Sequence, residues 1–276
     1  MFKRKVNITR IKKDKKEEMQ DIVLVESPID IIVNSEPLVN IICLPKDLKE
    51  LAVGFLYSIG ILNRIEDIKE IKVNELDNKI FINLNDTIDF NIENLDINPV
   101  SRVVDTTCGI SSSWRNIIKK SLNEGNVKPI LENDIKLSSE IIYSSIKKMQ
   151  IETPLYRETG GCHGAAIFNF KGELLACKED IGRHNAIDKV IGEILLKKEN
   201  FKNKFLTSTG RLTGDCVLKA VRAKIPIVAS LSAAVESGIR LAFAYGITLI
   251  GFARGAKMNI YTNSHRIELI KPKLNT

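Results

Sequence analysis

The sequence lacks the features that mark several large protein classes. None of its apolar runs is long enough to span a bilayer, and the polar, basic first residues do not resemble a secretion signal, so we expect a cytoplasmic protein without membrane contacts. Aromatic residues make up only 6% of the 276 residues, which argues against a platform that stacks single-stranded nucleic acid. The sequence contains neither a Walker loop nor a GxGxxG fingerprint, so it specifies no standard nucleotide-binding fold.

Cysteine is sparse and irregularly spaced. The five cysteines are an odd number, and no two of them form a Cys-x-x-Cys pair, which argues against a disulfide framework and against a zinc site. We expect free thiols and no permanently bound metal. Cys43 and Cys177 lie in strand patterns and Cys216 lies near a helix start, so these three are expected in the core. Cys162 lies among glycines beside His163, and exposed and buried positions are both open for it.

One thiol lies in a segment of a different character. Cys108 belongs to the stretch VVDTTCGISSSWRN, residues 103–116, where a glycine and a run of serines follow it. Such a composition is typical of a loop. Arg102 and Arg115 flank this cysteine, and nearby cations favour the thiolate, which is the nucleophilic form of a cysteine. Cys108 is therefore the candidate nucleophile.

Positive charge is concentrated at the two ends of the chain. The net charge is +7, and much of it comes from the runs KRK, RIKKDKK and IKPKLNT. Residues 1–21 are interpreted as a basic N-terminal tail, because basic ends are usually solvated. A nucleic-acid-binding protein is the weakest of the alternatives, and it would require steeply salt-dependent binding that is lost without these ends. We expect no nucleic-acid partner.

The rest of the chain divides into two halves with different rhythms. Residues 22–130 are predicted to form a smaller α+β domain, with a hairpin over 22–43, a helix opened by Pro45, short strands over 67–90, the Cys108 loop and a helix over 113–123. Residues 131–276 alternate strands with helices, among them a hairpin that turns at Lys171-Gly172 and a helix over RHNAIDKVIGEILLKK with one apolar face. This alternation predicts a largely parallel sheet covered by helices on both faces, which is a three-layer α/β/α domain.

Glycine and positive charge gather in four loops of the second half. The loops are RETGGCHGAA, EDIGRHNA, STGRLTGDC and GFARGAK, and each is predicted to lie at a strand end. In such sheets, binding sites lie at the carboxyl ends of the strands. Turn glycines with solvated charges would explain any one loop. Four loops at one edge favour an anion site, because helix N-termini and arginines bind phosphate groups.

The same loops carry a family resemblance. The segments TTCGISS, TGGCHGAAIF, EDIGRHNAIDKVIG, STGRLTGDCVLKA, ASLSAAVESGIRLA and GFARGAKMNIYT resemble the successive motifs of the FdhD/NarQ family of formate dehydrogenase accessory sulfurtransferases, over about residues 25–265. The resemblance implies a sulfur carrier. Such a protein takes sulfur from a cysteine desulfurase as a cysteine persulfide and passes it to the molybdenum or tungsten bis-guanine-dinucleotide cofactor of formate dehydrogenase. It also implies a homodimer and a second domain that resembles the cytidine deaminase fold.

The resemblance assigns roles to particular residues. The persulfide cysteine maps onto Cys108. The cofactor-binding stretch maps onto Phe252, Ala253, Arg254, Gly255, Ala256 and Lys257. Arg183 and Arg211, from two of the other loops, are expected beside that stretch. The zinc signature of the deaminases, H-x-E with P-C-x-x-C, is absent, so deamination is not implied.

One position departs from the family pattern. Many members carry Cys-x-x-Cys at the carrier cysteine, whereas here the second position is Ser111. A mechanism that needs two thiols at this place is therefore in doubt, but a carrier with a single persulfide is not. The alternative from another functional class is a cofactor-binding chaperone in which Cys108 has no chemical role.

Overall fold

The N-terminal half is built on a five-stranded sheet. The computed structural model describes residues 2–88, 90–95, 103–104, 112–124, 127–131 and 134–269. The sheet has the order β5-β6-β3-β4-β7, with β3 (Ser27–Val33), β4 (Glu36–Cys43), β5 (Ile68–Asn74), β6 (Lys79–Leu84) and β7 (Val103–Val104). Alternate residues of β3, namely Ile29, Ile31 and Val33, are fully buried. One face of the sheet therefore belongs to the core.

One helix covers that face, and a second packs against the first. They are α1 (Leu48–Ile59) and α2 (Ser112–Glu124), and short 3₁₀ turns lie at Ile65–Asp67 and Ile92–Leu95. Trp114 of α2 is fully buried and packs edge-on against Phe55 of α1, with the ring centroids 5.3 Å apart. The predicted strands and both helices are present, although the first helix begins at Leu48, three residues after Pro45.

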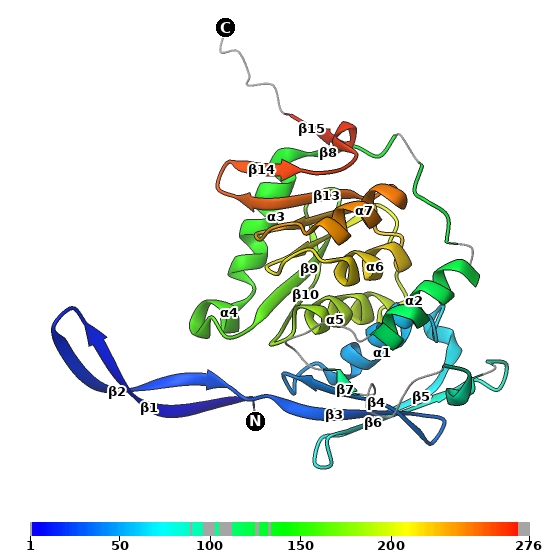
Figure 1. Ribbon diagram of the computed structural model, residues 1–276, viewed down its shortest axis with the longest axis horizontal. Coiled ribbons are helices and arrows are strands. Elements are labelled where there is room, and N and C mark those ends of the chain that lie inside the picture. The colour runs from blue at the N-terminus through cyan, green and yellow to red at the C-terminus, as the bar shows by residue number, and fades with distance from the viewer. Residues whose placement is uncertain are drawn as a thin grey trace, which may run out of the picture.

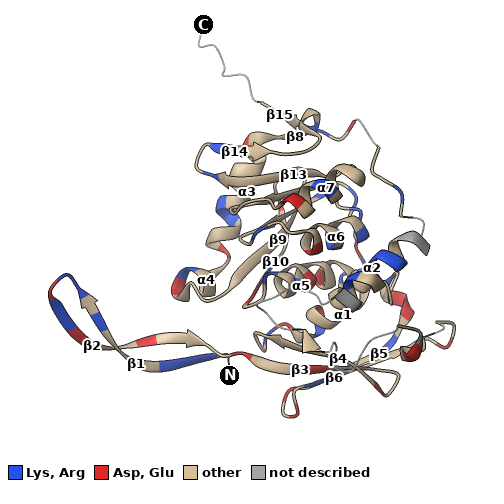
Figure 2. Ribbon diagram, viewed as in Figure 1, with Lys and Arg blue, Asp and Glu red and all other residues tan. Residues whose placement is uncertain are grey.

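Residues 3–24 form an arm that projects from the body (Figure 1). The arm is an antiparallel hairpin of β1 (Lys3–Lys12) and β2 (Lys15–Leu24), in place of the tail that we expected over 1–21. The pairing sets Arg10 of the basic first strand opposite Glu17 of the second. Beside this pair, Thr9 donates a hydrogen bond to Glu18 at 2.7 Å. Figure 2 shows the basic residues along β1 and at the tip of the arm.

The C-terminal half contains a six-stranded mixed sheet in the order β10-β9-β11-β12-β13-β14. Its strands are β9 (His163–Asn169), β10 (Leu174–Asp180), β11 (Lys204–Ser208), β12 (Ile227–Ser230), β13 (Thr248–Arg254) and β14 (Lys257–Ile260). Of its five strand pairs, only β11–β12 and β12–β13 are parallel and the other three are antiparallel, so the prediction of a largely parallel sheet was wrong. The links at 170–173 and 255–256 are too short for a crossover, and they force antiparallel hairpins.

Helices lie on both faces of this sheet, as the alternating pattern predicts (Figure 1). The helices are α3 (Ser139–Ile151), α4 (Pro154–Thr159), α5 (Arg183–Leu196), α6 (Gly214–Arg222) and α7 (Glu236–Ala244). Helix α3 packs on one face, and α5 and α7 pack on the other. A small parallel pair, β8 (Leu137–Ser138) and β15 (Ile267–Glu268), joined to a 3₁₀ turn at Ser264–Arg266, completes the described part. The likeness to cytidine deaminases stays a prediction.

The two halves share one core across helices α1 and α5. A Cβ on Gly54 would lie 1.8 Å from the carbonyl oxygen of Asp188, and one on Gly192 would lie 1.9 Å from that of Glu50. Only glycine permits this approach. Below the contact, the ammonium of Lys219 lies 2.7 Å from the buried carboxylate of Asp188. The hydrophobic core is continuous from Ile29 to Leu249, so the predicted division between residues 130 and 131 is not a break in packing.

Candidate functional site

The glycine-rich loops meet at one edge of the mixed sheet. Asp180, at the end of β10, pairs with His163, at the start of β9. The backbone nitrogen of Thr209, just after β11, donates to the carbonyl oxygen of Gly164 at 2.9 Å. A Cβ on Gly210 would lie 2.8 Å from the Cβ of Arg183, so these two loops touch. The predicted convergence of these three loops is confirmed.

A basic pocket opens beside these loops. Its volume is about 530 Å³, and it lies where α2, α6 and α7 approach the N-terminus of α5. The described residues that line it include four cations and one carboxylate, together with smaller side chains: Arg115, Lys119, Arg183, Thr213, Gly214, Asp215, Leu218, Ser237, Arg240 and Leu241. The excess of positive charge suits an anionic ligand.

Arg115 and Asp215 tie α2 to the N-terminus of α6 inside the pocket. The Nε of Arg115 lies 2.8 Å from Oδ1 of Asp215, and its Nη2 lies 3.1 Å from Oδ2. Burial alone would raise the pKa of the Asp215 carboxyl, but the hydrogen bonds and charge of Arg115 outweigh burial and hold that pKa below its usual range. Asp215 is therefore ionised at neutral pH, and Arg115 donates to it in the bidentate geometry that stabilises such pairs.

Two buried side-chain nitrogens, Nε of Arg183 and Nε2 of His184, have no hydrogen-bond partner among the described residues. The other ring nitrogen of His184, Nδ1, lies 3.5 Å from Sγ of Cys216. Burial first, and the charges of Lys219 and Arg183 second, lower the pKa of His184 to about 3. The imidazole is therefore neutral at physiological pH.

The four described cysteines are poor nucleophiles. Cys43, Cys162 and Cys216 are buried, and burial raises the pKa of all three thiols, to about 12 for Cys162. Burial likewise raises the pKa of the half-buried Cys177 thiol to about 12. Cys162, for which exposure was an open alternative, is only 4% exposed because it packs with Leu44 and Leu155. Cys43 and Cys216 lie in the core as predicted.

The predicted nucleophile is not among the described residues. Cys108, with Arg102, Gly109 and Ser111, lies in a stretch outside the part of the chain that the structure describes. The next described residue along the chain is Ser112, which begins α2. Within the described ranges, no group of three or more histidine, cysteine, aspartate or glutamate side chains could hold a metal ion.

The predicted cofactor-binding stretch occupies the β13–β14 hairpin. Arg254, Gly255, Ala256 and Lys257 are exposed at its tip, and Ala253 is buried at its base. Phe252 has a φ of 51°, a left-handed conformation that is strained for a bulky residue, and such strain is concentrated at functional sites. The guanidinium of Arg254 lies 5.9 Å from the Phe252 ring centroid.

The hairpin and the basic pocket lie at the same edge but are separate. The loop after β12 lies between them, since Ser232 accepts a hydrogen bond from the Phe252 nitrogen at 2.9 Å and the Leu212 nitrogen donates to Ala233 at 3.0 Å. Arg183 lines the pocket. Burial is the main cause that lowers the pKa of His163, and the positive charges of Arg183 and Arg211 lower it further. The structure therefore groups Arg183 with Arg211 and not with Arg254.

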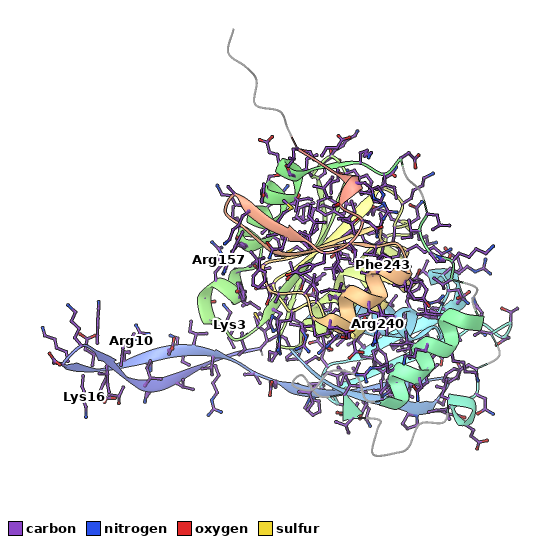
Figure 3. The ribbon with its side chains drawn as sticks, turned by 45° about the horizontal axis from the view of Figure 1, so that its top comes forward. Lys3, Arg10, Lys16, Arg157, Arg240 and Phe243 are labelled. Atoms are coloured by element: carbon purple, nitrogen blue, oxygen red, sulfur yellow. The ribbon has the colours of Figure 1, made fainter. Side chains whose placement is uncertain are left out.

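Sequence reasoning missed three residues of the pocket. Lys119 follows Arg115 by one helical turn, and that spacing could have placed both on one face of α2. Asp215 belongs to a loop already singled out, but a lone aspartate gave no signal. Arg240 resembles a solvated helix charge, and Figure 3 shows it on α7 near the exposed Phe243. Neither was identifiable without the packing of α6 on α7.

A model of the FdhD/NarQ family matches residues 24–268. The chain belongs to the FdhD/NarQ family. The family model covers both halves of the chain and every loop of the candidate site, and it begins at the last residue of the arm. No helix in the described residues is long and apolar enough to cross a membrane.

Relatives with curated names align with nearly the whole chain. The protein named sulfur carrier protein FdhD from Saccharolobus solfataricus is 37% identical over 268 residues, which are 96% of this chain and 98% of that protein. The protein of the same name from Wolinella succinogenes is 34% identical, over 97% of this chain and 90% of its own length. The crystal structure of a proposed formate dehydrogenase accessory protein from Desulfotalea psychrophila superposes with a TM-score of 0.76 and 28% identity, over 97% of this chain and 100% of that one.

Proposed function

We propose that this FdhD/NarQ-family protein carries sulfur as a persulfide on Cys108 and transfers it to the molybdenum or tungsten bis-guanine-dinucleotide cofactor, which formate dehydrogenase requires. The family match supports this proposal, because relatives along the full length are named sulfur carriers. The basic pocket is the structural observation that supports the proposal most strongly, because Arg115, which lines it, lies on the helix that begins four residues after Cys108. A ligand held in that pocket would lie beside α2, whose first residue follows the thiol by four positions in the chain.

The chemistry assigns Cys108 to both transfers. Its thiolate attacks the outer sulfur of a persulfide on a cysteine desulfurase, a new S–S bond forms, and the donor leaves as a thiolate. In delivery, the outer sulfur passes to the metal of the cofactor, and Cys108 leaves as a thiolate. The sulfur atom arrives at the sulfane level, so the metal must supply two electrons to make it a sulfide ligand. Ser111 cannot release sulfide by closing a disulfide, which suits a carrier that holds its cargo.

Two basic clusters, one in the pocket and one on the β13–β14 hairpin, would each bind a different part of the substrate. The cofactor has two dinucleotide arms, each with a diphosphate. Arg183, Arg240 and Lys119 in the pocket can bind one, and Arg254 and Lys257 on the hairpin can bind another. The cofactor is the substrate of this reaction. We also propose a cytoplasmic homodimer that meets a desulfurase and the catalytic subunit of formate dehydrogenase in turn.

Activation of formate dehydrogenase tests this function against the chaperone alternative. Formate dehydrogenase would be co-expressed with the wild type, Cys108→Ala or Cys177→Ala in cells that lack their own copy of this protein. We expect Cys108→Ala to abolish activation and Cys177→Ala, which removes the one described thiol that is not fully buried, to retain it. Full activation by Cys108→Ala would favour a chaperone without sulfur transfer.

A further inference from the structure

A second cavity lies at the opposite edge of the mixed sheet from the glycine-rich loops. Its volume is about 730 Å³. Four connections meet there: the segment before β8, the β9–β10 turn, the link from α5 to β11, and the link from α6 to β12. The described residues that line it are Lys128, Pro129, Ile130, Leu131, Ile135, Phe170, Phe201, Lys202, Asn203, Ala223, Lys224 and Pro226.

The walls of this cavity are fixed by hydrogen bonds. The backbone nitrogen of Ile130 donates to the carbonyl oxygen of Tyr245 at 3.0 Å, and the carbonyl of Ile130 accepts from Nη2 of the buried Arg266 at 2.9 Å. On the other side, the nitrogen of Phe170 donates to the carbonyl of Asn203 at 3.0 Å. The cavity is thus a product of the fold, since each wall is tied to the sheet or to helix α7.

The interior is apolar and aromatic. Phe201 is 7% exposed, and its ring centroid lies 6.0 Å from that of Tyr57. The ring of Phe170 is packed against Phe205, with centroids 6.4 Å apart. Leu131, at the rim, is 77% exposed. An exposed large apolar side chain beside a cavity is typical of a binding surface. These surfaces would bind a flat apolar group.

The charged residues at the rim that the structure describes are all positive. Lys128, Lys202 and Lys224 line the cavity, and no aspartate or glutamate is among the described lining residues. None of the three ammonium groups makes an ion pair or a side-chain hydrogen bond within the described ranges, whereas the neighbouring Lys204 is paired with Glu199 at 3.3 Å. Three unpaired cations around an apolar interior complement a ligand with a negative charge on an apolar body.

We propose that this cavity is a second ligand site, which binds an aromatic organic anion, with the ring between Phe170 and Phe201 and the negative group at the lysines. The site is independent of the proposed sulfur transfer, because it uses neither Cys108 nor any residue of the basic pocket. The probe for it is anilinonaphthalene sulfonate, which carries one negative charge on an aromatic body. Phenyl naphthylamine, which has the same body without the charge, is the matched neutral probe.

The test measures saturable binding of both probes by fluorescence titration of the wild type and three variants. We expect the double variant Lys128→Glu/Lys202→Glu to weaken the binding of the anionic probe by about tenfold or more, and the binding of the neutral probe by less than about twofold. Leu131→Asp should weaken both probes. Lys16→Glu, at the tip of the arm (Figure 3), is the control for general attraction of anions to a basic protein, and it should change neither.

Three outcomes would overturn the proposal. The first is the absence of saturable binding to the wild type, and the second is an equal loss of both probes in the double variant. The third is a loss in Lys16→Glu as large as that in the double variant. Because Lys128, Lys202 and Leu131 are exposed, we expect their substitutions to leave the fold intact. An unchanged far-ultraviolet circular dichroism spectrum is the check on each variant.

Discussion

Arg115 and Asp215 form a bidentate ion pair between helices α2 and α6, with 2.8 Å from Nε to Oδ1 and 3.1 Å from Nη2 to Oδ2. The pair has two consequences. It fastens α2, the helix that follows the proposed carrier cysteine Cys108, to the N-terminus of α6, and it places the only carboxylate among four cations that line the basic pocket in its described part. Asp215 therefore opposes the binding of any anion there.

Removing that carboxylate should strengthen anion binding. We expect Asp215→Asn to bind guanosine diphosphate, a model for half of the cofactor, about three- to tenfold more tightly at low salt, because a nearby negative charge is lost. Isothermal titration calorimetry measures the change, and raising the salt concentration should reduce it. Asp86→Asn, at an exposed position in the turn after β6, is the control. Equal affinity in Asp215→Asn and wild type would mean that the nucleotide binds elsewhere.

The two basic clusters should contribute separately to nucleotide binding. We expect Arg240→Ala to weaken guanosine diphosphate binding at the pocket and Arg254→Ala to weaken it at the hairpin, each by roughly tenfold and each without effect on the other site, since each removes a charge-assisted contact to phosphate. Arg157→Ala, an exposed arginine on α4 shown in Figure 3, should retain wild-type affinity. If neither Arg240→Ala nor Arg254→Ala changes the affinity, neither cluster holds the nucleotide.

The close contact of α1 and α5 should tolerate no side chain. Gly54→Ala would bring its Cβ to 1.8 Å from the carbonyl oxygen of Asp188, so the helices would have to separate. We expect a loss of about 3 kcal/mol or more in the free energy of unfolding, measured with urea. Gly161→Ala is the matched control, because its Cβ would meet nothing closer than 3.4 Å. A loss of similar size in both variants would contradict the close-contact account.

The parts of the fold that the sequence predicted are those with a strong local signal. Helix α5 has an apolar stripe, and the β9–β10 hairpin turns at Gly172 with a φ of 81°, which favours glycine. The arm was missed because its strands carry few apolar residues, and its order comes from cross-strand pairs such as Thr9 with Glu18. Strand β14 runs antiparallel to β13 because the link between them, residues 255–256, is short, and the alternation of strands and helices in the C-terminal half did not predict this direction.

The site was predicted where residues cluster in sequence and missed where packing brings them together. Arg183 was identified because it lies in a glycine-rich loop. Arg240 belongs to an ordinary amphipathic helix, and it joins the pocket only because α7 packs on α6. Cys162 shows the opposite failure, because its glycine neighbours left exposure open while Leu44 and Leu155 bury it.

Buried His184 should make stability depend on pH. Burial lowers its pKa in the folded protein to about 3, whereas the unfolded chain has an ordinary imidazole near pKa ~6.5. Between these values the unfolded state binds more protons, so stability falls as the pH falls below about 6.5, by at most about 1.4 kcal/mol per pH unit for this group. Urea unfolding at pH ~7 and ~5 measures the difference.

The matching variant is His184→Gln, which cannot titrate in this range. It should lose less stability than the wild type between the two pH values, and the remaining loss would include His163, whose pKa burial also lowers. His265→Gln, which removes an exposed imidazole, should keep the wild-type dependence. If His184→Gln shows the same loss as the wild type, the imidazole of His184 is not the buried neutral base that the structure shows.

If Cys108 alone carries the sulfur, mass spectrometry of the loaded protein should find a persulfide on that residue and on no other. The protein would be incubated with a cysteine desulfurase and cysteine, and then analysed intact and after proteolysis under conditions that preserve persulfides. The account predicts an adduct of a single sulfur atom on the peptide that contains Cys108, and its loss in Cys108→Ala. The four other thiols have raised pKa values and should remain unmodified. An adduct on Cys162, Cys177 or Cys216 that persists in Cys108→Ala would contradict the account.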